Sequence, residues 1–247
     1  MIDGLKLFTK LLPVLLQSNA LVYYMAPVLS LVLMLMIWYS FPSYRFEVNF
    51  MLSGLFLLVI IGLRVYSTLL SGWASNSKYA LLGGMRASAQ SISYEVSMAI
   101  LIIATMVLYK RIYLGVYLSG GLFMALWLAP LMICFYLRCV AECNRAPFDF
   151  AEGESELVSG FNIEYGSVTF SLIFIAEYGI IITFSLLTGL LFTRTFLVLI
   201  IWLLISSILI LRRIYPRFRY DKLMYLAWYK FLPLSIIWLY ISYGFRL

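Results

Sequence analysis

The chain has no histidine, and only three of its 247 residues are cysteines. Without imidazole groups it offers no histidine ligand for haem or zinc and no histidine for acid–base catalysis. Cys134, Cys139 and Cys143 lie at or near the end of one apolar segment. Three thiolates are fewer than the four that an iron–sulfur cluster usually needs, so we expect small apolar fillers on a helix. The sequence therefore predicts no histidine-based haem or zinc site, no iron–sulfur cluster and no other metal site.

Charged residues are also scarce. Only 12% of the residues are charged and 64% are hydrophobic, whereas soluble domains have about 25% charged residues. A soluble fold of this length cannot bury so much apolar side chain, which indicates that lipid is the solvent. The net charge of +7 is not a sign of nucleic-acid binding, because the basic residues are scattered between apolar segments.

The apolar segments predict an all-α polytopic membrane protein. Lipid offers no hydrogen-bond partners to a free backbone, so each membrane-spanning segment should be a helix. We expect one membrane domain over residues 1–247, without room for a separate extramembrane domain. About seven spans of roughly 20 residues fit the sequence, at Leu21–Phe41, Val48–Ser71, Ala89–Leu108, Leu114–Leu137, Val168–Phe192, Thr195–Leu211 and Tyr225–Tyr243.

Residues 1–13 predict a short amphipathic helix that lies in the membrane interface. Its five large apolar residues share a broad face, with Asp3, Lys6 and Lys10 elsewhere. The connections on the same side of the membrane as this helix carry eleven Lys or Arg, against five on the other side. This asymmetry makes that side the cytoplasmic or matrix side.

An acidic connection over residues 142–167 faces the same side. It contains six of the eleven acids of the chain: Glu142, Asp149, Glu152, Glu154, Glu156 and Glu164. A solvated surface loop is one interpretation, but phenylalanine, leucine and valine are interleaved with the acids. That pattern favours a segment that packs against the membrane or a partner. Crowding in a poorly solvated site raises the pKa of some carboxylates, which suits a proton relay.

Two further acids, Glu95 and Glu177, fall inside predicted spans. A carboxylate at that depth costs roughly 3 kcal/mol unless it is protonated, paired or hydrated. A satisfied structural contact is one explanation, and a stepping stone for protons is the other. Arg64 is the one basic residue well inside a span, and we expect it to pair with one of the acids.

Glu142 ends its span within one turn of two arginines, Arg138 and Arg145, and either could hold it ionised. Two other polar segments are expected to be connections. Residues 72–86 predict an interfacial helix connection. The basic loop over residues 212–224 predicts contact with lipid headgroups or, alternatively, docking to a peripheral partner.

Three segments, Gly72–Glu95, Ala141–Tyr165 and Tyr215–Pro233, resemble the chain 1 family of NADH:ubiquinone oxidoreductase, respiratory complex I. Asp3–Lys10 resembles the amphipathic helix of that family. The resemblance implies a subunit without a redox centre, at the elbow between the hydrophilic and membrane arms. It also implies ubiquinone as substrate, with FMN and iron–sulfur clusters in partner subunits.

The same resemblance implies roles for individual residues. Those expected at the quinone cavity are Arg145, Asp149, Phe148, Phe150 and Phe161. Those expected on a proton or coupling path are Glu95, Glu142, Glu152, Glu154, Glu156, Glu164 and Glu177. The implied partners are the peripheral quinone-module subunits, small membrane-arm subunits and membrane lipids, with no nucleic acid.

Family members usually begin with another transmembrane helix, so we expect either a separate chain that supplies it or a truncated sequence. Two alternatives to this function remain. The first is the equivalent subunit of a membrane-bound hydrogenase-type complex, which its partner subunits would distinguish. The second is a stand-alone transporter, which leaves the acidic segment unexplained. The aromatic-rich composition without histidine favours the mitochondrial inner membrane, with a bacterial plasma membrane as the alternative.

Overall fold

The computed structural model describes residues 2–10, 19–42, 51–110, 112–115, 129–149, 160–192 and 197–244, and every regular element in these ranges is a helix. Within these described ranges, five helices are long and apolar enough to cross a membrane. They are α2 (Ala20–Tyr39), α3 (Ser53–Ala74), α4 (Lys78–Tyr109), α8 (Ser167–Phe192) and the C-terminal helix (Tyr220–Gly244). The prediction of an all-α polytopic membrane protein is confirmed.

Three further helices correspond to the other predicted segments. The N-terminal helix α1 (Ile2–Thr9) begins the predicted amphipathic segment, α6 (Ala129–Glu142) ends the fourth predicted span, and α9 (Leu197–Ile214) matches the sixth. The remainder of the fourth span falls on residues 116–128, which lie outside the described residues. The predicted number of spans is therefore tested only for the described part of the chain.

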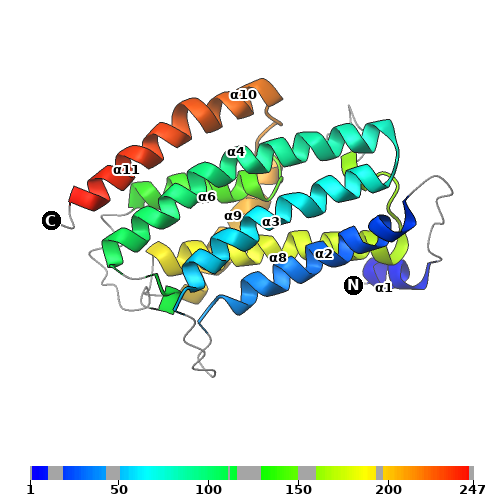
Figure 1. Cartoon of the computed structure of the whole chain (residues 1–247), viewed down its shortest axis with the longest axis horizontal. Coiled ribbons are helices and arrows are strands. Elements are labelled where there is room, and N and C mark those ends of the chain that lie inside the picture. The colour runs from blue at the N-terminus through cyan, green and yellow to red at the C-terminus, as the bar shows by residue number, and fades with distance from the viewer. Residues whose placement is uncertain are drawn as a thin grey trace.

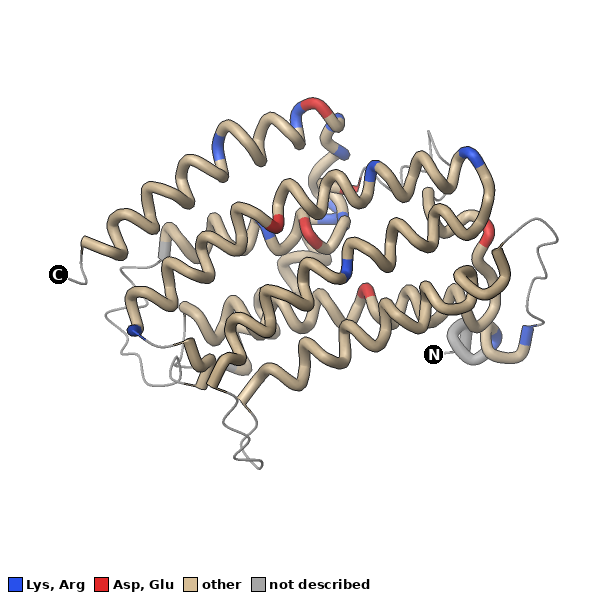
Figure 2. Tube along the Cα trace, viewed as in Figure 1, with Lys and Arg blue, Asp and Glu red and all other residues tan. Residues whose placement is uncertain are grey.

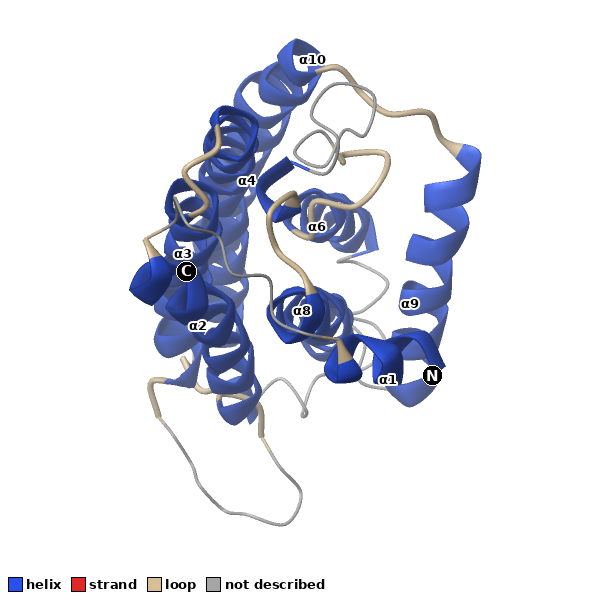
Figure 3. Ribbon diagram, turned by 90° about the vertical axis from the view of Figure 1, so that its right-hand side faces the viewer, coloured by secondary structure: helices blue, strands red, loops and turns tan. Residues whose placement is uncertain are grey.

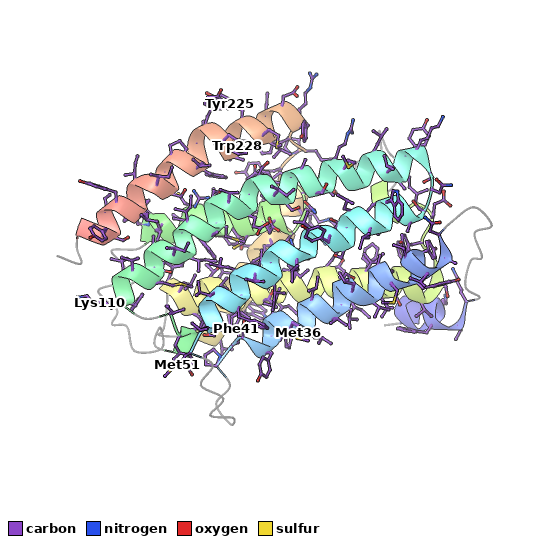
Figure 4. All side chains as sticks on the ribbon, viewed as in Figure 1. Met36, Phe41, Met51, Lys110, Tyr225 and Trp228 are labelled. Carbon is purple, nitrogen blue, oxygen red and sulfur yellow. The ribbon has the colours of Figure 1, made fainter. Side chains whose placement is uncertain are left out.

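The long helices run side by side (Figure 1). Viewed along their axes, α2, α3 and α4 form one layer, α6 and α8 lie next to it, and α9 and α1 lie beyond them (Figure 3). The C-terminal helix packs along α4. Phe41, Met51 and Lys110 lie at one end of this bundle, opposite the end that holds α1 (Figure 4). Few charges lie along the helices apart from a group in the middle of the bundle (Figure 2).

Glycines let α3 and α4 approach each other closely. A Cβ on Gly72 would lie 2.8 Å from the carbonyl oxygen of Ala80, and a Cβ on Gly84 would lie 3.2 Å from the Cα of Gly72. Lipid tails are as apolar as leucine, so helices in a membrane associate through such backbone packing. The expectation of a connection over residues 72–86 is therefore wrong for most of its length, because only residues 75–77 separate the two helices.

The C-terminal helix contains a π-helical turn. Its parts are α10 (Tyr220–Tyr225), the π-helical η3 (Leu226–Phe231) and α11 (Leu232–Gly244). Pro233 lies just after the π turn and has no N–H to donate, which favours such a departure from α-helical bonding. The basic loop is shorter than predicted, since only residues 215–219 are not helical.

Two side chains from other helices hold this C-terminal helix in place. The hydroxyl of Tyr94 on α4 donates to the carbonyl of Leu223 at 3.0 Å. The guanidinium of Arg138 on α6 donates to the carbonyl of Phe231 at 2.6 Å, and its carbon lies 4.9 Å from the centre of the Phe231 ring. Arg138 is fully buried, so its contacts with Phe231 lie in the protein core and not at the surface.

Candidate functional site

A cleft opens among α2, α3, α4 and α8, with the end of α6 as one wall. Its volume is about 630 Å³, with the open space at its mouth included. Three residues predicted for the site, Glu142, Phe161 and Glu177, line it. The other lining residues mix apolar side chains with hydroxyls and one cation, among them Ala26, Arg64, Ser67, Thr68, Ser71, Ser91, Ile173 and Ile180.

One wall of the cleft is formed by an ion pair between α3 and the end of α6. Nη2 of Arg64 lies 2.6 Å from Oε1 of Glu142 and 2.8 Å from the Glu142 carbonyl oxygen. The expected pairing of Arg64 with an acid is confirmed. The alternative that Arg138 or Arg145 holds Glu142 is not what the structure shows. Arg138 bonds to Phe231 instead, and Arg145 pairs with Glu177.

Glu95 lies close to the same guanidinium. Its carboxylate approaches the backbone of α3 at Gly62, where a Cβ would lie 2.7 Å from Oε1 of Glu95. The charge of Arg64 acts on Glu95 as well as on Glu142. The structure therefore groups one cation with two carboxylates from three different helices. Movement of the guanidinium toward one carboxylate weakens its attraction for the other.

A second ion pair joins the acidic segment to α8. Nη2 of Arg145 is 2.6 Å from Oε2 of Glu177 on α8, and the guanidinium carbon lies 5.0 Å from the centre of the Tyr178 ring. Arg145 is buried, whereas the Glu177 side chain reaches the cleft. Cys143 interacts electrostatically with members of both ion pairs, and burial raises the pKa of its thiol to about 12. The thiol therefore stays neutral near neutral pH.

The side chain of Gln90 fastens the first part of the acidic segment to α4. Nε2 of Gln90 donates to the carbonyl oxygens of Ala141 at 3.0 Å and Phe148 at 2.8 Å. Between these two acceptors, Asn144 adopts a left-handed conformation with φ of 50°. Asparagine tolerates this region better than most residues. One buried amide thus fixes both ends of the turn that carries Arg145.

Phe148 and Asp149 are buried but do not line the cleft. The Phe148 ring stacks on Phe218 at 5.7 Å, and the Phe218 amide donates to the Pro147 carbonyl at 3.0 Å. Asp149 lies 3.9 Å from Arg217. Their predicted contribution to a quinone cavity stays a prediction. In the described structure both residues instead dock the basic connection against the acidic segment.

The second part of the acidic segment, residues 160–166, contributes Phe161 to the lining of the cleft. Phe161 lies in the short helix η2 (Gly160–Asn162) and is buried. The Tyr23 hydroxyl donates to the carbonyl of Glu164 at 2.8 Å, and the Tyr23 and Tyr165 rings stack with centres 4.4 Å apart. These contacts hold the backbone, whereas the half-buried carboxylate of Glu164 does not line the cleft. Phe150, Glu152, Glu154 and Glu156 lie outside the described residues.

A row of hydroxyls on α3 also lines the cleft and was not predicted from the sequence. Ser67, Thr68 and Ser71 follow Arg64 at helical spacing, so all four share one face of an otherwise apolar helix and line the cleft. The Ser67 hydroxyl donates to the Arg64 carbonyl at 2.7 Å, and the Ser71 hydroxyl to the Thr68 carbonyl at 2.8 Å. Each hydroxyl thus donates its hydrogen bond within its own helix. The hydroxyl oxygens make this wall of the cleft polar. The spacing from Arg64 was the signal that could have identified them.

Replacement of Gln90 by leucine tests how the turn is held. The substitution removes the donor to two buried carbonyls, and buried unsatisfied acceptors are costly, so we expect a loss of about 1–3 kcal/mol in stability. Thermal denaturation of the purified assembly measures this loss. Ser206→Ala on α9, whose hydroxyl bonds only within its own exposed turn, is the control. Equal melting temperatures for Gln90→Leu and this control would contradict the role assigned to Gln90.

No group of three or more Cys, Asp or Glu side chains in the described ranges is arranged to hold a metal ion.

Comparison with known proteins gives one consistent result. The NADH dehydrogenase family matches residues 1–243. NADH-ubiquinone oxidoreductase chain 1 of Aedes aegypti is 46% identical over 253 residues, which cover 99% of this chain and 80% of that protein. The protein of the same name from Locusta migratoria is 44% identical, and that from Balaenoptera physalus is 45% identical, with 79% and 78% of their lengths covered.

Proposed function

The chain belongs to the NADH dehydrogenase family, and from this premise we propose that its cleft serves ubiquinone reduction in NADH:ubiquinone oxidoreductase. The relatives that match nearly the whole chain carry the name of subunit 1 of that enzyme. We propose that the cleft forms part of the path by which ubiquinone reaches its reduction site. We further propose that the acids around Arg64 begin the route that couples reduction to proton translocation.

The observation that carries this proposal is the presence of two salt bridges, one buried and one partly buried, at one open cleft. Both Glu142 and Glu177 line the cleft, and each is held by an arginine 2.6 Å away. Ala26 of α2 and Ile173, Ala176 and Ile180 of α8 add apolar surface to the lining. A quinone has an apolar tail and a head with two polar oxygens, and ligand sites of this kind combine apolar walls with a few placed polar groups.

The chemistry of the reaction explains why charges that can rearrange are needed here. Reduction of ubiquinone to ubiquinol takes up two electrons and two protons. We propose that the electrons come from iron–sulfur clusters and FMN in partner subunits, in keeping with the NADH-ubiquinone oxidoreductase name of the relatives. Negative charge that develops near the cleft attracts Arg64 and Arg145 and thereby weakens their hold on Glu142 and Glu177.

A carboxylate that loses its cation in a poorly solvated site binds a proton more readily. Under this proposal, Glu142 takes up a proton when Arg64 moves away and releases it when the ion pair forms again. Glu95 is a further carboxylate on which the charge of the same guanidinium acts. The exchange of Arg64 between two carboxylates then passes the charge signal from the cleft toward α4. Glu152, Glu154, Glu156 and Glu164 are proposed to lead protons or charge into this cluster, and Asp149 and Phe148 to support its wall.

Membership of the NADH dehydrogenase family also suggests the partners and the membrane of this chain. The partners are the other subunits of the enzyme, including peripheral subunits at the quinone site and small subunits of the membrane arm. We place the chain in the mitochondrial inner membrane, on the basis of the multi-pass fold and the aromatic-rich composition without histidine. The acidic segment then faces the matrix.

Replacement of Glu142 by glutamine in the intact enzyme tests this proposal. The amide keeps the size of the side chain but cannot take up or release a proton, so we expect at least a tenfold loss of NADH:ubiquinone activity and of the associated proton pumping. NADH oxidation with an artificial acceptor that bypasses the quinone should stay normal. Asp221→Asn is the matched control, since Asp221 is an exposed acid paired with Arg219. Normal quinone-linked activity and pumping in fully assembled Glu142→Gln enzyme would overturn the proposed role.

A further inference from the structure

A second hollow lies on the outer surface, where the C-terminal helix begins. Its volume is about 860 Å³, with open space included. Its lining combines apolar residues, among them Phe218, Leu223 and Leu226, with the two lysines Lys222 and Lys230. We call this hollow the lysine groove. It is separate from the cleft that Arg64 and Glu142 line, because the two share no residue.

The lysine groove carries positive charge that the described residues leave uncompensated. Its one acid, Asp221, lies 3.2 Å from Arg219 and is neutralised by it. Neither Lys222 nor Lys230 forms an ion pair within the described ranges, and both are exposed. Arg212 and Arg213, in the last turn of α9, add charge of the same sign to this connection. The groove is therefore suited to an anion.

The position of the groove indicates which anion. It lies in the first three turns of a helix that is long and apolar enough to cross the membrane, on the side richest in Lys and Arg. Headgroup phosphates occupy this depth, and the aliphatic stem of a lysine lets its ammonium reach them. The rings of Tyr225 and Tyr229 stack 4.8 Å apart on the same turns, as interfacial aromatics do. Tyr225 lies at the outer edge of the bundle (Figure 4).

Below the lysines the same helix offers an apolar surface. Ile236, Ile237 and Tyr240 are all exposed, and they continue toward the opposite membrane face. A ligand that satisfies the whole surface must combine an anionic head with long apolar chains. A soluble anion meets only the first requirement. An acidic segment of a partner protein meets the charge but leaves the apolar surface below it uncovered.

We propose that the lysine groove binds one anionic phospholipid, with its phosphate between Lys222 and Lys230 and its acyl chains along α11. The lipid then covers the outer face of the helix that Arg138 and Tyr94 hold from the inside. This inference does not depend on the function of the cleft, since a lipid can occupy the groove whether or not ubiquinone reaches Glu142.

Photolabelling of the intact enzyme in phosphatidylcholine nanodiscs tests the proposal. A trace of phosphatidylglycerol with a photoreactive group near its phosphate should label the segment that contains residues 218–230. An excess of unlabelled phosphatidylglycerol should abolish the labelling, whereas phosphatidylcholine or inorganic phosphate should not. Labelling by a phosphatidylcholine probe to the same extent would overturn the proposal. No labelling of this segment would overturn it as well, and would indicate that a protein partner covers the groove.

The double variant Lys222→Gln/Lys230→Gln supplies an independent test. Each basic side chain near an anionic lipid surface contributes about 1 kcal/mol, which corresponds to about a fivefold change in affinity per lysine. We expect the preference for the phosphatidylglycerol probe to fall by about this factor for each substitution. Lys78→Gln, an exposed lysine on the same side of the membrane but outside the groove, should leave it unchanged. An unaltered preference in the double variant would contradict the assignment.

Discussion

Replacement of Arg64 by methionine is expected to destabilise the protein by about 3–5 kcal/mol, because it leaves the buried Glu142 carboxylate without its cation. Arg64 donates to both the carboxylate and the backbone carbonyl of Glu142. Glu142 is only 1% exposed, so solvent compensates little for the lost donor. Methionine keeps much of the volume of the side chain, which separates the loss of charge from the loss of packing.

The double variant Arg64→Met/Glu142→Gln decides whether the uncompensated charge is the cause. Removal of both charges removes the main penalty, so we expect the double variant to recover most of the stability that Arg64→Met loses. The yield of assembled enzyme and its melting temperature measure both. The matched control is the exposed pair Arg219–Asp221, where Arg219→Met should cost at most about 1 kcal/mol because solvent screens the pair. A double variant no more stable than Arg64→Met would show that packing, not charge, sets the cost.

The sequence predicted the helices well because each apolar run must become a helix in lipid, whatever its neighbours are. The same reasoning identified Glu95, Glu142, Glu177 and Arg64 as costly charges that needed partners. It could not assign the partners. For Glu142 the sequence offered two arginines on its own segment and Arg64 as candidates, and the structure selects Arg64 of α3, 78 residues earlier in the chain.

Pairing of this kind depends on which faces of two helices meet, and the packing of the whole bundle decides that. Residues with small side chains set the helix crossings, and their effect depends on contacts that one sequence does not specify. Gly62 illustrates this, since it has no distinctive neighbours in the sequence but gives the Glu95 carboxylate its place against α3. The π-helical turn before Pro233 was also not predicted, because proline alone does not specify how the helix accommodates it.

Gly83→Ala is expected to have the second largest effect, although it adds a single methyl group. A Cβ on Gly83 would lie 2.7 Å from the Cα and carbonyl carbon of Gly160 and 2.8 Å from the amide nitrogen of Phe161. These are backbone atoms, and Gly160 is itself in a left-handed conformation with φ of 62°. Neither side can yield by changing a rotamer. We therefore expect a cost near or above the upper end of the about 1–3 kcal/mol typical of overpacking.

Whether Gly83→Ala lowers or raises the stability distinguishes a close contact from its absence. Inside a helix, alanine is more stable than glycine by roughly 0.5–1 kcal/mol, so without the close contact Gly83→Ala would stabilise the protein. At Gly244, near the end of α11, a Cβ would meet nothing within 4 Å, and Gly244→Ala is the control. Melting temperatures should fall for Gly83→Ala and stay the same or rise for Gly244→Ala. The added methyl group displaces η2, and Phe161 of η2 lines the cleft. We therefore expect quinone-linked activity to fall more than the yield of assembled enzyme. A rise in the melting temperature of Gly83→Ala would mean that η2 does not pack against α4 in this way.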